Sequence, residues 1–226
     1  MTPVLIDDDT LAGTDVVANN AMNRERGLQS YARELGFDLL GWLDGRGGTA
    51  SRPQRWLDIC CGSGRALVEA DSMVNVDEPR LLLTGVDLVA PNVATSSTLD
   101  LVSASIASWS PRHRYDLITC VHGLHYIGDK LGLIARLAQW LTNDGRFVAS
   151  FDTRSVRDRD GRPMARATGA VIAPLGMTYN GRRRLLQRDG GAYVASPWRY
   201  LGADTAAGPN YTGQPAVASY YDRDKR

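Results

Sequence analysis

The residues best suited to chemistry lie in one short segment, 56–64, which reads WLDICCGSG. Asp58 stands near the end of an apolar run that predicts a strand, and Gly62 and Gly64 follow in a turn before a predicted helix. Glycine permits positive φ and lets a backbone approach a ligand closely, and the first N–H groups of a helix have no partner inside it. We therefore expect a small molecule to bind at this turn.

The spacing of the glycines argues against the common phosphate-binding turns. A dinucleotide fingerprint needs a third glycine where this chain has Leu67, and no Lys-Ser/Thr pair follows for a P-loop. Asp58 would repel a pyrophosphate but suits a ligand's ammonium group, directly or through water. The next predicted strand ends in Asp87, whose carboxylate can accept two hydrogen bonds from ribose hydroxyls.

Strands and helices alternate along the part of the chain that must position these side chains. Continuous apolar runs favour a parallel sheet that is covered on both faces. The predicted strands are 55–60, 81–86, 99–104, 115–121 and 146–151, and the predicted helices are 66–74, 91–99 and 130–141.

The two ends of the chain carry different patterns. An amphipathic helix is predicted over 24–43, with Tyr31 on its apolar stripe. Segments 183–187 and 192–198 flank an Asp-Gly-Gly turn at 189–191 and predict an antiparallel hairpin. We expect the segment from 202 onward to be a loop or a lid.

These features resemble the class I S-adenosylmethionine-dependent methyltransferases. Asp58, Gly62 and Gly64 match the first motif of that family, and Asp87 matches the second. The resemblance spans roughly residues 54 to 152, judged from the alternating strands. It implies an α/β fold: a Rossmann-like, mostly parallel seven-stranded sheet with helices on both faces, an antiparallel C-terminal hairpin and an N-terminal helical lid. It also implies a helical cap over 1–48 and a catalytic domain over 49–226 that includes the hairpin and the tail.

The resemblance further implies a set of site residues, with S-adenosylmethionine as the cofactor and no metal. After the third strand the family often has an acid that bonds the adenine amino group, whereas this chain offers Ser105. The implied cofactor-binding residues are Asp58, Cys60, Gly62, Gly64, Asp87, Leu88, Ser105, Ile106, Val121 and His122.

Three residues are candidates for catalysis: His122, His125 and Tyr31. The two histidines follow the fourth strand, and an imidazole can act as a base near neutral pH. Tyr31 or Arg24 could contact the cofactor's carboxylate or the acceptor, although core packing is an equal expectation for Tyr31 and His125 could simply pack under the next helix. We also expect one or two aromatic side chains of the C-terminal region to reach the substrate.

Composition and charge limit the classes of function. The net charge of +1 gives no whole-protein field to attract nucleic acid or an anionic membrane. Three cysteines and three histidines show neither a disulfide framework nor zinc spacing, and no apolar run is long enough to span a membrane. We expect a cytoplasmic protein with a small-molecule partner; its oligomeric state stays open.

The sequence thus predicts a transferase, an S-adenosylmethionine-dependent methyltransferase that acts on a small molecule in secondary metabolism or other biosynthesis. The alternative is a cyclase of the same fold that forms azetidine-2-carboxylate and releases methylthioadenosine. An RNA methyltransferase is less favoured, although nine arginines lie between 154 and 188. The intact motifs argue against a non-enzymatic scaffold.

Overall fold

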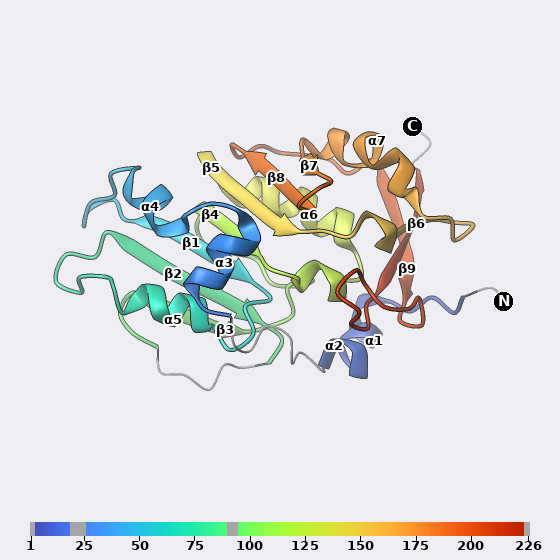
Figure 1. Cartoon of the computed structure of the whole chain (residues 1–226), viewed down its shortest axis with the longest axis horizontal. Coiled ribbons are helices and arrows are strands. Elements are labelled where there is room, and N and C mark those ends of the chain that lie inside the picture. The colour runs from blue at the N-terminus through green and yellow to red at the C-terminus, as the bar shows by residue number, and fades with distance from the viewer. Residues whose placement is uncertain (1–2, 19–25, 90–94, 224–226) are drawn as a thin grey trace.

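A seven-stranded, mostly parallel sheet forms the centre of the molecule in the computed structural model, which describes residues 3–18, 26–89 and 95–223 (Figure 1). The strand order is β3-β2-β1-β4-β5-β8-β7. β8 runs antiparallel to both β5 and β7, and the other neighbouring strands pair in parallel. The strands are β1 (Gln54–Ile59), β2 (Leu81–Asp87), β3 (Leu99–Ser103), β4 (Tyr115–Cys120), β5 (Leu141–Ser150), β7 (Thr178–Asn180) and β8 (Leu185–Asp189). The predicted Rossmann-like α/β fold is confirmed.

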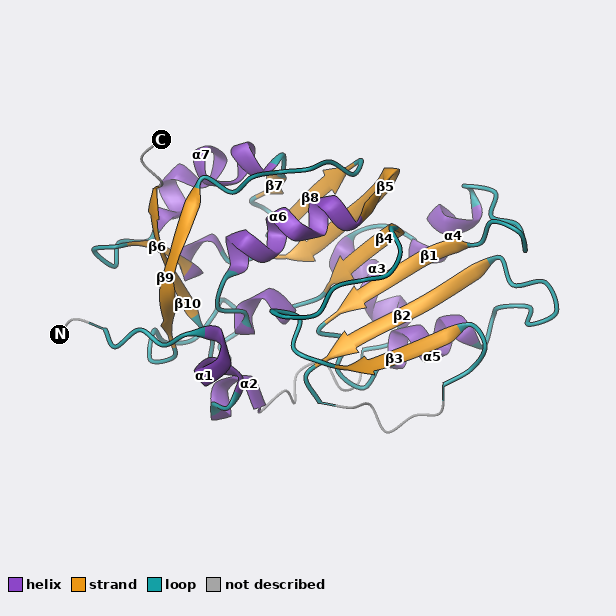
Figure 2. Cartoon of the chain, turned by 180° about the vertical axis from the view of Figure 1, so that it is seen from behind, coloured by secondary structure: helices purple, strands orange, loops and turns teal. Residues whose placement is uncertain are grey.

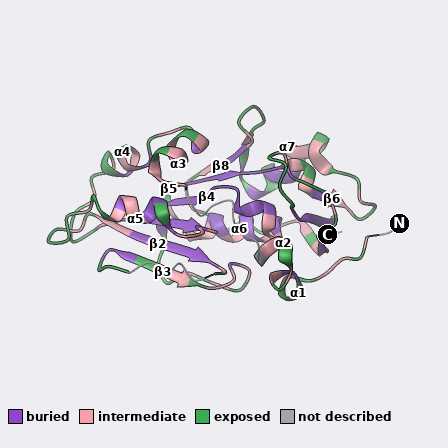
Figure 3. Cartoon of the chain, turned by 60° about the horizontal axis from the view of Figure 1, so that its bottom comes forward, coloured by how far each residue is buried: buried purple, intermediate pink, exposed green. Residues whose placement is uncertain are grey.

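Burial on both faces explains why the central strands read as continuous apolar runs. All six residues of β4 are buried, and Figure 3 shows the buried strands at the centre of the molecule. Neighbouring side chains of β1 enter two separate hydrophobic clusters: Trp56 belongs to the cluster that contains Leu35, and Leu57 belongs to the cluster that contains Phe147. Each face of the sheet therefore has its own core.

Helices cover both faces of the sheet, as predicted (Figures 1 and 2). One face carries α3 (Leu28–Leu35), α4 (Leu39–Asp44) and α5 (Arg65–Asp71), and the other carries α6 (Lys130–Trp140). The prediction of a single helix over 24–43 is wrong, because Gly36 adopts φ 79° and ends α3 and the Asp38 side chain caps a new helix. The helix expected over 91–99 lies partly outside the described residues, and residues 95–98 are not helical.

The C-terminal region forms antiparallel pairs, but not at the predicted turn. A three-stranded sheet contains β6 (Val156–Asp158), β10 (Ala218–Arg223) and β9 (Trp198–Asp204), and β9 and β10 are the confirmed antiparallel hairpin. The turn at 189–191 does not join two paired strands, because β8 finds its partners in β5 and β7. The tail was expected to be a loop or lid, yet Tyr220 and Tyr221 are buried within β10.

The remaining helices are short and lie around this second sheet and the edge of the first. They are α1 (Asp8–Ala12), α2 (Asp15–Ala18), α7 (Thr168–Ile172), η1 (Gly123–Tyr126), η2 (Thr153–Ser155), η3 (Met164–Ala167) and η4 (Ala173–Leu175). Within residues 3–18, 26–89 and 95–223, no helix has the length and apolar character needed to cross a membrane.

Contacts with β9 hold α1 in place, although the two segments lie at opposite ends of the chain. Ile6 forms an antiparallel bridge with Ala203, and Leu11 packs against Ala203 in a small hydrophobic cluster. The hydroxyl of Tyr200 donates a hydrogen bond to Oδ1 of Asp8 at 3.0 Å. These contacts place α1 and α2 near the edge of the sheet toward which β2 and β3 point (Figure 2).

Candidate active site

The turn after β1 has the backbone geometry that its glycines suggested. Gly62 adopts φ 60° and Gly64 adopts φ 71°, immediately before α5 begins at Arg65. Cys60 also has a positive φ, 54°, which is uncommon for a residue with a side chain. The backbone N–H of Gly62 donates to Oδ2 of Asp87 at 2.8 Å, so the turn after β1 is tied directly to the end of β2.

A pocket opens at the carboxyl ends of β2 and β3. Five of the implied cofactor residues line it, namely Cys60, Asp87, Leu88, Ser105 and Ile106. The opposite wall comes from α1, the segment after it, and η1 with the residues that follow: Asp8, Leu11, Ala12, Val17, Tyr126, Ile127 and Gly128. No local pattern indicates the wall from α1, because pairing with β9, far away in the sequence, brings that segment here.

Asp58 lies in the core beside the pocket and does not line it. Its side chain is 1% exposed, and its oxygens accept hydrogen bonds from the hydroxyl of Tyr31 at 2.8 Å and that of Thr119 at 2.6 Å. Burial raises the pKa of Asp58 to about 7, although both hydrogen bonds oppose that shift. The Tyr31 hydroxyl is therefore held on Asp58, and Thr119 in turn accepts a bond from Trp56 Nε1 at 2.8 Å.

His122 stands at the end of β4 in a left-handed conformation, with φ 62°. Its Nε2 lies 3.4 Å from a carboxylate oxygen of Glu34 on α3, and its Nδ1 lies 3.4 Å from the Tyr211 hydroxyl. Burial lowers the pKa of His122, and the Glu34 carboxylate partly offsets the shift. Glu34 was not predicted, since its position on α3 gives no sign of which face it shares with His122.

His125 is fully buried, and neither ring nitrogen has a hydrogen-bond partner among the described residues. Burial lowers its pKa to about 3, so the ring is neutral at pH 7. The ring of Tyr211 contacts both histidines: its centroid lies 6.0 Å from that of His122 in a tilted arrangement and 5.1 Å from that of His125 in an edge-to-face arrangement. The guanidinium of Arg184 lies 4.3 Å from the Tyr211 ring centroid. Tyr211 is thus one C-terminal aromatic that meets the candidate catalytic histidines.

The other sequence predictions fall in three places. Gly62 adjoins the pocket through its hydrogen bond to Asp87, Gly64 and His122 are not among the lining residues, and Val121 is buried in the core on the face of α3. Arg24 lies outside the described residues. In the described part of the chain, no group of three or more His, Cys, Asp or Glu side chains is arranged to hold a metal ion.

The chain adds β2 and β3 on one side of β1 and then β4 and β5 on the other side, so the order of the strands switches at β1. The pocket lies at the carboxyl ends of the strands beside this switch point, where open α/β sheets bind ligands. This fold is the one found in class I, Rossmann-like methyltransferases. A sequence profile described as a methyltransferase domain matches residues 24–203. The chain belongs to this family, and with it to the S-adenosylmethionine-dependent methyltransferases. No curated protein sequence matches it significantly.

Solved structures resemble the chain at low identity. The N-methyltransferase NodS from Bradyrhizobium japonicum WM9, in complex with S-adenosylhomocysteine, is 15% identical over 82% of this chain and 98% of its own, with a TM-score of 0.46. The plantazolicin methyltransferase BpumL, in complex with a monoazolic desmethylPZN analog and S-adenosylhomocysteine, is 19% identical over 59% of this chain and 51% of its own, with a TM-score of 0.45. The match thus spans about half the length of BpumL.

Proposed function

We propose that the chain transfers a methyl group from S-adenosylmethionine to a small molecule. The observation that carries this proposal is the pocket at the ends of β2 and β3, where Asp87, Leu88, Ser105 and Ile106 meet beside the glycine turn. When bound, S-adenosylmethionine supplies an electrophilic methyl group on its sulfonium. The protein then has to align the acceptor with that methyl group and exclude water.

Asp87 has the chemistry to hold the ribose. One carboxylate oxygen accepts the N–H of Gly62 at 2.8 Å and the other accepts the N–H of Val89 at 3.1 Å. Each oxygen of an ionised carboxylate can accept a further bond, so hydroxyls of a ribose can still be received. Ser105 and Ile106 would flank the adenine, and Gly62 and Cys60 would lie along the ribose.

Asp58 and the two residues that donate to it, Tyr31 and Thr119, support the methionine end of the cofactor in this proposal. Asp58 fixes the hydroxyls of Tyr31 and Thr119, and we assign Tyr31 to positioning through Asp58. Gly64 ends the glycine turn, and Val121 directly follows β4, the strand paired with β1. In this proposal residues 1–48 act as a cap and residues 49–226 as the catalytic domain, with α1 closing the pocket from the cap.

His122 is proposed as the base that removes a proton from the acceptor. Its lowered pKa leaves the imidazole neutral at pH 7, which is the form that accepts a proton. Glu34, 3.4 Å from Nε2, can stabilise the positive charge that then forms. His125 and Tyr211 pack beside His122, with ring centroids 5.7 and 6.0 Å from its own. The ring nitrogens of His125 have no partner among the described residues and can hydrogen-bond a polar atom of the methyl acceptor.

Calorimetry with S-adenosylmethionine tests the binding step, and chromatography of the nucleoside product tests the reaction. Absence of binding to the full chain would refute the proposal. Labelled S-adenosylmethionine incubated with an extract of the source organism should give S-adenosylhomocysteine and a labelled acceptor. Methylthioadenosine as the main product would instead establish the cyclase alternative. RNA as the labelled product would replace the small-molecule acceptor.

A further inference from the structure

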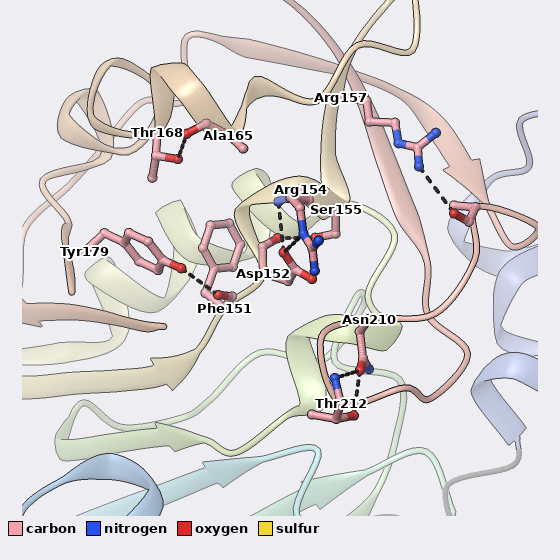
Figure 4. Close-up of polar contacts among 11 residues, drawn as sticks. Phe151, Asp152, Arg154, Ser155, Arg157, Ala165, Thr168, Tyr179, Asn210 and Thr212 are labelled. Atoms are coloured by element: carbon pink, nitrogen blue, oxygen red, sulfur yellow. Dashed lines mark hydrogen bonds and ion pairs between the residues drawn. The ribbon is translucent and has the colours of Figure 1, made fainter. Parts of the chain in front are cut away.

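A second pocket lies between the chain that leaves β5 and the 205–217 loop that joins β9 to β10. Figure 4 shows Asp152 and Arg154 on the first segment, Asn210 on the loop, and Arg157 on β6. The full lining is Asp152, Arg154, Ser155, Arg157, Pro163, Ala207, Gly208, Pro209, Asn210, Ala216, Val217 and Ala218. The methyl-donor site described above uses none of these residues.

Asn210 lines this pocket and carries an unsatisfied donor. The side chain is 7% exposed, and its Oδ1 accepts hydrogen bonds from the N–H and the hydroxyl of Thr212 at 2.7 and 2.6 Å. The backbone N–H of Thr212 can only donate, so the orientation of the Asn210 amide is fixed. Its NH₂ group is buried and has no hydrogen-bond partner among the described residues.

Arg157 lines the same pocket and carries a second unsatisfied donor. Its two terminal nitrogens donate to the Tyr220 hydroxyl at 3.2 Å and to the Ala207 carbonyl at 3.4 Å. These bonds hold the guanidinium in place, while its buried Nε–H has no partner within the described chain. Two donors without partners in the described chain, both on residues that line one pocket, favour a ligand atom that accepts hydrogen bonds.

The charges around the pocket favour a single negative charge on that ligand. Arg154 and Arg157 contribute two positive charges, and the nearly buried carboxylate of Asp152, 3.4 Å from Arg154 Nε, contributes one negative charge. The balance of +1 matches a carboxylate. A phosphate dianion would add a second negative charge close to Asp152, which disfavours it.

The pocket adjoins the candidate catalytic histidines through its own wall. Asn210 is followed directly by Tyr211, whose hydroxyl lies 3.4 Å from His122 Nδ1. The N–H of Val217 donates to the carbonyl of His125 at 2.9 Å. A ligand held by Asn210 would therefore lie on the same loop that packs on both histidines.

We propose that this pocket binds a carboxylate group of the methyl acceptor, with Asn210 and Arg157 as its hydrogen-bond donors and Arg154 as an additional positive charge. This inference rests on the proposed function for the identity of the ligand as the acceptor. The substrate class is then a small molecule that bears a carboxylate at a distance from the atom to be methylated.

Calorimetric titration of the full chain with benzoate and with benzamide tests the pocket, because the two probes share a shape and differ in charge. Benzoate should bind about tenfold more tightly than benzamide, as expected for charge-assisted over neutral hydrogen bonds. Asn210→Asp preserves shape and the bonds to Thr212 but replaces the donor with a negative charge, and should weaken benzoate binding by at least about tenfold. Asn180→Asp is the matched control, since Asn180 is exposed on β7 and its Oδ1 likewise accepts a backbone N–H; benzoate affinity should change by less than about twofold.

Titration with S-adenosylhomocysteine in the same samples separates the two proposals. If it binds wild type and Asn210→Asp equally while only the variant loses benzoate, the carboxylate pocket is supported. Equal affinity for benzoate and benzamide, or unchanged benzoate binding by Asn210→Asp, would overturn the pocket and would mean that water alone satisfies the two donors. Failure of S-adenosylhomocysteine to bind would overturn the proposed function and the assignment to an acceptor, whatever the benzoate result.

Discussion

Tyr31→Phe removes one hydrogen bond from a buried carboxylate without changing the shape of the core. The Tyr31 hydroxyl donates to Asp58 at 2.8 Å, and both side chains are about 1% exposed. After the substitution, the hydroxyl of Thr119 is the one side-chain donor to Asp58 that remains among the described residues. The lost bond stabilises the ionised form of Asp58, so its pKa should rise above the wild-type value of about 7.

The size of the effect should depend on pH. A hydrogen bond to a charged group contributes about 1.5–3 kcal/mol, against about 0.5–1.5 kcal/mol for a neutral pair. The folded pKa of Asp58, about 7, exceeds its ordinary value of 3.8. The proton held by the folded state therefore adds stability that is fully present below pH 3.8 and is lost as the pH rises through 7. Tyr31→Phe should therefore cost about 1–2 kcal/mol more at pH 8 than at pH 5.

Thermal unfolding at pH 5 and pH 8 measures this difference. For a chain of this length, 1 kcal/mol corresponds to a shift in Tm of about 2–4 °C. Tyr179→Phe is the matched control, because the Tyr179 hydroxyl donates to the neutral carbonyl of Phe151 at 3.2 Å and its loss should be the same at both pH values. Equal losses for Tyr31→Phe at pH 5 and pH 8 would show that Asp58 does not ionise in this range, and the reasoning would fail.

Three further substitutions probe the pocket, the chemistry and the core. Asp87→Ala should weaken S-adenosylhomocysteine binding about tenfold to 100-fold in calorimetry, because the ribose loses charge-assisted hydrogen bonds. His122→Ala should lower the rate of S-adenosylhomocysteine production by roughly 10²–10⁴ with little change in cofactor affinity, as for loss of a general base. Burial lowers the pKa of Lys130 from 10.5 to about 7. The free energy of unfolding of the wild type should therefore rise between pH 7 and 10, because the unfolded chain holds the proton and the folded chain does not. Denaturant titrations of Lys130→Met should lack this rise.

Each of these substitutions has an outcome that would contradict its reasoning. If Asp87→Ala binds S-adenosylhomocysteine with unchanged affinity, the Asp87 carboxylate does not bind the ribose. If His122→Ala has the wild-type rate between pH 6 and pH 9, on either side of the usual imidazole pKa of about 6.5, His122 has a structural role and is not the general base. The stability of wild type and of Lys130→Met could instead show the same pH dependence. That result would mean that the three hydrogen bonds from Lys130 Nζ to Ile127, Val217 and Ser219 keep the ammonium charged in the folded state.

Local patterns predicted the sheet well and the long-range contacts poorly. Strands predicted at 55–60 and 115–121 appear as Gln54–Ile59 and Tyr115–Cys120, because burial on both faces demands apolar residues throughout. The hairpin predicted around the Asp-Gly-Gly turn at 189–191 is wrong. These residues favour a turn, but β8 pairs with β5 and β7 and not with the segment after the turn. Glu34 on α3 and Tyr211 on a distant loop contact His122, and no residue spacing in the sequence predicts such long-range contacts.

The hydrogen bond between Asp8 and Tyr200 joins positions 192 residues apart in the sequence, and it helps to hold the α1 wall of the pocket. Closing so long a loop costs conformational entropy that only prior order in β9 and β10 can reduce. The central sheet can form from contacts of shorter range, so folding should produce a complete sheet before α1 docks. Maturation of the pocket is then a late kinetic event, distinct from collapse of the core, and ligand affinity should appear after the secondary structure of the sheet does.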